Sequence, residues 1–181
     1  MEPKVNSTQP PQNTDAEASL LGALLIDSEA IVKVADNVSP QDFFDKRNER
    51  IYEAIVQLYD KHEAVDVLTL SNQLKNNGHL EGVGGPSYLT ELTNFVPTAA
   101  HVEQYADIVA QKAMRRRLIT ASREIVELGY DESKQLNELI EEAEASLFNV
   151  SQQHIKQDII SLETILAESF DRLDDLHKDK E

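Results

Sequence analysis

Apolar residues recur at intervals of three and four along most of this chain, which is the spacing of helices that bury one face. The alternation typical of strands is almost absent, so the pattern predicts an all-α protein. Shorter helical segments are expected after Asp27 and Ser39. The main predicted helices lie at about 14–26, 46–61, 67–76, 86–95, 99–128, 135–150 and 161–177.

Capping residues set the expected boundaries of these helices. Thr14 is predicted to cap the first helix, with Glu17 completing a capping box. Asp66 is expected to cap the helix at 67–76, and Thr98 to cap the longest helix. Gly129 is the expected stop of that helix, because glycine commonly adopts the left-handed conformation at a helix end.

A glycine-rich stretch in the middle of the chain predicts a tight turn. Gly82, Gly84 and Gly85 precede Pro86, which is expected to begin a short helix. A phosphate-binding loop would need Lys-Ser/Thr after its glycines, and neither follows here. The glycine-rich segment is therefore predicted to be a turn that connects two helices.

The two long helices are joined only by residues 130–134, and so short a connection predicts an antiparallel hairpin. Apolar positions occur on more than one side of this hairpin. Packing against the first hundred residues would cover some of them, and pairing with a second hairpin would cover the rest. We favour self-association over a purely internal role. Candidate residues for the pairing surface are Val109, Ala113, Arg116, Leu118, Leu139, Ala143 and Leu147.

Both ends of the chain differ in pattern from its middle. Residues 1–13 are polar and contain proline, which predicts a disordered arm, and the polar segment 151–160 predicts a linker. The helix at 161–177 carries a narrow apolar stripe that no later element could cover. That stripe consists of Leu162, Ile165, Leu166, Phe170, Leu173 and Leu176.

Charge and composition narrow the possible partners. The net charge is −16 and no section of the chain is basic, so we expect little direct binding to the phosphate backbone of nucleic acids. The sequence has no cysteine, which excludes disulfides and thiolate metal sites. It also lacks an apolar run long enough for a membrane span and an apolar signal-peptide core. Proteins are the expected partners, in the cytoplasm.

Catalytic motifs are missing. None of the histidines has a second ligand at helical spacing that would build a zinc site, and no carboxylate pair stands in an apolar setting. The segment 67–95 could imitate a helix-turn-helix, but its second helix has no Lys or Arg to read DNA. The basic run Arg115-Arg116-Arg117 is either a solvated face or a contact across a subunit boundary. No metal, cofactor or catalytic residue is expected.

Several short motifs, taken in order, resemble the N-terminal domain of the bacterial hexameric replicative DNA helicase of the DnaB type. The opening helix, with Ala16-Glu17 and Leu21-Gly22, is similar to that of the family. The later matching motifs are Asp42-Phe43-Phe44, Val65-Asp66-Val67-Leu68-Thr69, Gly84-Gly85-Pro86-Ser87-Tyr88-Leu89, Pro97-Thr98-Ala99-Ala100 and Tyr105-Ala106-Asp107-Ile108-Val109.

The resemblance implies a compact helical globular subdomain at 14–97, an antiparallel helical hairpin at 98–150 and a separate C-terminal linker helix at 161–177. Hairpins would pair into homodimers, and three dimers would form a ring collar that recruits a DnaG-type primase. The positions matching the primase-contact region are Tyr88, Ile119 and Ile125, for which core packing is the alternative. The linker helix would dock on the ATPase domain of the neighbouring subunit.

The family's ATPase domain, which would bind ATP and Mg²⁺, is expected soon after His177 and is not in this sequence. The chain by itself is therefore not expected to be an enzyme. A helicase loader is a further candidate partner. Two alternatives remain open: a stand-alone acidic adaptor that binds helicase or primase, and a small all-α enzyme with a carboxylate site.

Overall fold

The computed structural model describes residues 9–155, with side chains through residue 152. Every regular element in this range is helical, which confirms the prediction of an all-α protein. The elements are α1 (Thr14–Ile26), η1 (Ser28–Lys33), η2 (Pro40–Asp42), α2 (Lys46–Asp60), α3 (Val67–Asn76), η3 (Glu81–Val83), α4 (Gly85–Thr93), α5 (Val102–Gly129) and α6 (Leu136–Ile155), where η marks a short 3₁₀ helix.

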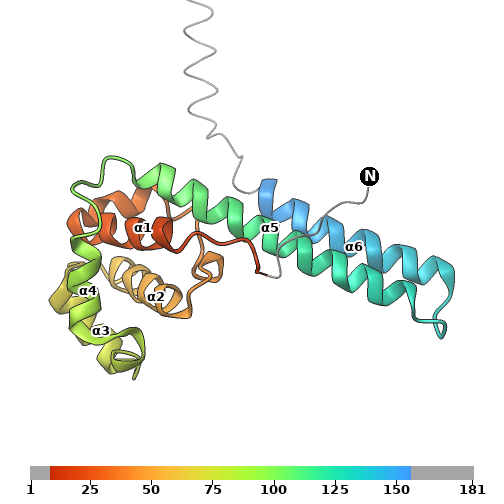
Figure 1. The fold of residues 1–181 in the computed structure, drawn as a ribbon, viewed down its shortest axis with the longest axis horizontal. Coiled ribbons are helices and arrows are strands. Elements are labelled where there is room, and N and C mark those ends of the chain that lie inside the picture. Colours follow the sequence, from red (N-terminus) through yellow and green to blue (C-terminus); the bar gives the residue numbers. More distant parts are fainter. Residues whose placement is uncertain (1–8, 156–181) are drawn as a thin grey trace, which may run out of the picture.

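The helices form two parts, which Figure 1 shows side by side. The elements from α1 to α4 pack into a compact body, and the first half of α5 lies along α1. The second half of α5 leaves the body and pairs with the antiparallel α6. We call this pair the hairpin.

The core of the body is built from the apolar faces that the helical spacing predicts. Large side chains at its centre are fully buried and come from α1, α2, α3 and α4. Phe43 also lies in this core, and its ring centre is 5.0 Å from that of Tyr52, whose hydroxyl donates to the carbonyl of Val38 over 3.0 Å. The fully buried residues include Leu20, Leu21, Leu24, Ile51, Ile55, Leu70, Leu74, Leu89 and Leu92.

Gly22 sets how closely α1 and α4 approach each other. A Cβ atom at this position would lie 2.2 Å from the carbonyl oxygen of Leu92. Only a residue without a side chain allows this separation of the two backbones.

Two of the predicted boundaries are confirmed. The Asp66 carboxylate accepts from the backbone N–H groups of Leu68 and Thr69, both at 2.8 Å, and Thr69 completes a capping box. These bonds to the charged form lower the pKa of Asp66. The glycine turn also forms, and Gly84, with φ of 101°, adopts the left-handed conformation that favours glycine.

Other predicted caps are wrong. Asn13 rather than Thr14 caps α1, since its side chain accepts from the N–H of Ala16 over 3.0 Å. Thr98 accepts from Ala100 in a local turn, and α5 begins only at Val102. Gly129 is the last residue of α5 and does not adopt a positive φ.

The pattern also misjudged some exposures and lengths. Val32 and Leu68 are apolar residues of helical segments, yet they are 62% and 72% exposed. Residues 151–155 continue α6 instead of beginning a linker. Pro11 and Asn13 make hydrogen bonds to the body and α5, so this part of the predicted disordered arm is ordered. The predicted linker helix at 161–177 lies outside the described residues.

Candidate protein–protein interface

One side of the hairpin carries a row of exposed apolar side chains. Ile119 and Val126 on α5 and Tyr130, which caps its C-terminal end, are separated by seven and four residues, which is the spacing of one helical face. On α6, Leu136, Ile140 and Leu147 repeat that spacing. We call this surface the apolar face. Its exposed members are Leu118, Ile119, Val126, Tyr130, Leu136, Ile140, Leu147 and, at its edge, Phe148.

The exposure of this face is large for apolar residues. Tyr130 is 83% exposed, Leu136 is 70% exposed and Val126 is 58% exposed. Contiguous apolar surface of this kind usually marks a site of protein association.

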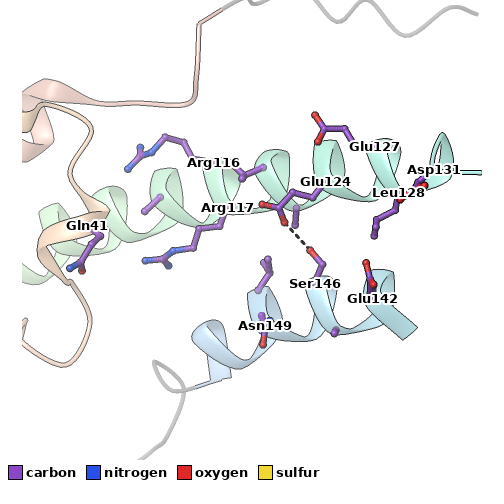
Figure 2. Close-up of a pocket in the computed structure, with 15 residues that line it drawn as sticks. Gln41, Arg116, Arg117, Glu124, Glu127, Leu128, Asp131, Glu142, Ser146 and Asn149 are labelled. Carbon is purple, nitrogen blue, oxygen red and sulfur yellow. Dashed lines mark hydrogen bonds between the residues drawn. The ribbon is translucent and has the colours of Figure 1, made fainter. Parts of the chain in front are cut away.

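A groove of about 850 Å³ lies on the opposite side of the seam between α5 and α6. Figure 2 shows Arg117 and Gln41 at its end near the body, and Glu124 facing Ser146, whose hydroxyl donates over 3.3 Å. Successive residues of a helix are about 100° apart, so residues two apart point in nearly opposite directions. Ala145 lines the groove, and Leu147 therefore belongs to the other side of α6.

The residues that line the groove form no evident catalytic or metal-binding site. Its rim carries several carboxylates, but no group of three or more His, Cys, Asp or Glu residues within 9–155 is arranged to hold a metal ion. Near the tip, Lys134 and Glu142 form an exposed ion pair at 2.6 Å, which adds little stability. Among the described helices, none is both long and apolar enough to cross a membrane.

The structure divides the predicted pairing residues into three groups. Leu118 and Leu147 are about half exposed and belong to the apolar face. Leu139 and Ala143 are partly buried in the hairpin. Val109 and Ala113 are each 2% exposed against the rest of the chain, so neither is available to a partner.

Arg116 also differs from its predicted role. Its guanidinium donates to the backbone carbonyls of Pro11, over 2.8 Å, and Asp42. Desolvation by burial lowers its pKa. Arg116 therefore serves contacts within this chain.

The candidate primase contacts lie in two separate places. Tyr88 is on α4 in the body, whereas Ile119 and Ile125 are on α5, in the part of that helix that belongs to the hairpin. Ile119 is 39% exposed, while Ile125 is partly buried.

Tyr88 belongs to a buried polar network. Its hydroxyl donates to Asn48 over 2.9 Å, and the Asn48 amide donates to Glu17 over 3.0 Å. The guanidinium of Arg47 lies 4.8 Å from the centre of the Tyr88 ring, within cation–π range. Burial is the main cause of the raised pKa of Tyr88. The Tyr88 side chain is partly buried, and its hydroxyl is held in place by Asn48.

Glu17 is the centre of this network, and the sequence did not reveal that role. It is 2% exposed, and its carboxylate also accepts from the backbone N–H groups of Phe44 at 2.7 Å and Asp45 at 3.2 Å. These donors precede α2, so a side chain of α1 orders the entrance to another helix. An acidic residue within an apolar stretch was the available signal.

These features define a class of protein: an all-helical domain whose hairpin presents an exposed apolar face, with no evident catalytic group in its described part. The chain belongs to the DnaB-like helicase N terminal domain family, whose match covers residues 9–111. It is 36% identical over 176 residues to the replicative DNA helicase DnaC of Bacillus subtilis, and 38% identical over 168 residues to the replicative DNA helicase DnaB of Rhodothermus marinus.

Solved structures agree with this assignment. The crystal structure of the N-terminal domain of DnaB helicase from Mycobacterium tuberculosis matches 78% of this chain and 99% of its own, with a TM-score of 0.75 and 38% identity. A DnaB-like replicative helicase, solved in a study of its interactions with primase, shares the fold. It matches 90% of this chain and 36% of its own, with a TM-score of 0.72 and 23% identity.

The match to the helicases covers only part of their length. The alignments span 97% and 93% of this chain, but 39% of the Bacillus subtilis relative and 18% of the Rhodothermus marinus relative. The 181 residues correspond to the N-terminal domain and do not include the ATPase domain.

Proposed function

We propose that this chain is the non-catalytic assembly module of a replicative DNA helicase. Hairpins pair through their apolar faces into dimers, and three dimers organise a hexameric ring. The observation that carries the proposal is the row of exposed apolar side chains along one side of α5 and α6. A four-helix arrangement of two such hairpins would remove this surface from water.

Recruitment of primase is the second part of the proposal. Tyr88, Ile119 and Ile125 are the candidate contacts, and the support is the family membership together with the primase interactions described for a helicase of the same fold. Since Tyr88 lies on the body and the two isoleucines on the hairpin, a primase domain that contacts all three would span both parts of this chain or bind two neighbouring chains.

The remaining partners follow from the same role. The apolar stripe at 161–177 would dock on the ATPase domain of a neighbouring subunit, and a helicase loader is a further candidate. ATP and Mg²⁺ would bind that ATPase domain rather than this module. The site of action would be the replication fork in the bacterial cytoplasm.

A pair of substitutions two residues apart on α6 tests which face of the hairpin pairs. Leu147→Glu puts a charge on the apolar face, and Ala145→Glu puts the same charge in the groove. A carboxylate buried in an apolar interface lacks a partner, so Leu147→Glu should weaken self-association about a hundredfold or more. Light scattering of the purified chains measures this effect.

The matched variant supplies the control. Ala145→Glu should associate as the wild-type chain does, because the groove stays open to water in the paired arrangement. Unchanged association of Leu147→Glu, or dissociation caused by Ala145→Glu alone, would show that pairing uses another surface.

A further inference from the structure

The helix α5 belongs to both parts of the molecule, and two adjacent arginines mark the place where it leaves the body. Up to Ala113, its buried residues pack on the body. Beyond that point only α6 accompanies it over most of its length. Arg116 and Arg117 follow within the next turn, at the root of the hairpin.

Arg117 holds α5 to η2 through a buried carboxylate. It forms an ion pair with Asp42, whose side chain is only 2% exposed. The other oxygen of that carboxylate accepts from the backbone N–H of Ser39 at 2.8 Å and from its hydroxyl at 2.9 Å. Asp42 is thereby fixed from two sides, and it gives Arg117 a rigid partner.

Arg116 makes a second attachment, to backbone carbonyls rather than to the Asp42 carboxylate. It donates to the carbonyl of Asp42 and, over 2.8 Å, to that of Pro11, and its guanidinium lies 5.8 Å from the centre of the Phe44 ring. Neighbouring residues of a helix point about 100° apart. In Figure 2 Arg116 and Arg117 accordingly leave α5 in different directions.

Two attachments at different angles restrain more than one motion of a helix. One contact would leave α5 free to roll about its axis or to tilt away from that contact. Contacts on two sides of α5 oppose both motions. A rotation of the helix that shortens the contacts of Arg116 stretches those of Arg117, and the reverse. The partners, Asp42 and Pro11, belong to segments that α1 and η2 hold in place.

We propose that Arg116 and Arg117 are positioning residues that fix the direction of the hairpin relative to the body. The inference rests on the proposed function, because paired hairpins would transmit this direction to the spacing of the bodies in a ring. The arginine pair would thus fix the angle between the hairpin and the body, in addition to any contribution to stability.

Distances between two spin labels within one chain test this role. The sequence has no cysteine, so Glu53→Cys on α2 and Glu141→Cys on α6, both at exposed positions, provide unique labelling sites on the body and the hairpin. An excess of unlabelled chain ensures that only distances within one chain are measured. The readout is therefore independent of whether hairpins pair.

The double variant Arg116→Ala/Arg117→Ala should roughly double the width of the distance distribution. Lysine at position 117 keeps a positive charge beside Asp42. The variant Arg116→Ala/Arg117→Lys should therefore have a narrower distance distribution than the double alanine variant. Arg123→Ala, at an exposed position of the same helix, is the control and should match the parent chain.

Circular dichroism first establishes that the double variant is folded, and if it is not, the single variants Arg116→Met and Arg117→Gln are measured in its place. A distribution as narrow as that of Arg123→Ala, in whichever of these variants is folded, would overturn the positioning role. An arginine variant that no longer self-associates but has an unchanged distance distribution would also contradict the positioning role. The paired-hairpin proposal is tested separately, by Leu147→Glu and Ala145→Glu.

Discussion

Gly22→Ala should destabilise the body by about 2–3 kcal/mol. The added methyl would lie 2.2 Å from the Leu92 carbonyl oxygen, so α1 and α4 must move apart at the centre of the core. Overpacking of this kind costs about 1–3 kcal/mol and occasionally more. Alanine is better than glycine inside a helix by up to about 1 kcal/mol, which offsets only part of the strain.

Gly129→Ala is the matched control for this substitution. It lies at the end of α5, has no atom within 4 Å of the added methyl and has no positive φ. Its stability should equal or slightly exceed that of the wild-type chain. Urea unfolding followed by circular dichroism measures both variants, and a Gly22→Ala chain as stable as Gly129→Ala would refute the close approach of α1 and α4.

Glu17→Gln should lower the free energy of unfolding by about 2–4 kcal/mol, although it replaces only one oxygen atom by an NH₂ group. The carboxylate accepts from three donors, the backbone N–H groups of Phe44 and Asp45 and the Asn48 amide. In either orientation, the glutamine amide turns its NH₂ group toward at least one of these donors. A buried donor without an acceptor costs about 1–3 kcal/mol, and bonds to a charged group are worth more than neutral ones.

The effect should extend to Tyr88, because Asn48 links it to Glu17. Loss of the network would release the tyrosine side chain, which NMR of the ring protons would report as faster ring motion. Glu53→Gln, at an exposed position of α2, is the control and should change neither stability nor Tyr88. If Glu17→Gln unfolded at the same urea concentration as this control, the network would have no energetic importance.

The sequence was most informative where structure depends on local contacts. Asp66 caps α3 through bonds to residues two and three positions away, and such a cap can be recognised from neighbouring residues alone. The helices of the body and the hairpin follow from apolar spacing for the same reason. The family motifs added the fold, which the structure and the comparisons confirm.

Contacts between residues far apart in the sequence explain why the main sequence predictions failed. Glu17 has the sequence context of a capping box, but its partners stand 27 to 31 residues further along the chain. Asp42 and Arg117 are 75 positions apart, and no spacing rule relates them. Val109 and Ala113 were predicted to pair because they lie on an apolar stripe, yet a stripe does not show whether its own chain or a second copy covers it.

The apolar face itself became visible only in three dimensions. Periodicity marks apolar positions of α5 and α6 on several sides of each helix. The packing of the two helices against each other and against the body shows which positions remain exposed. The paired-hairpin proposal thus depends on what the fold leaves uncovered.

Sedimentation equilibrium of the wild-type chain tests the central claim most directly. The chain has a mass of 20.3 kDa, and pairing of apolar faces predicts a species of twice this mass, or a higher even multiple, as concentration rises through the micromolar range. A mass of 20.3 kDa at every concentration in that range would contradict the claim that the hairpin is a self-association surface.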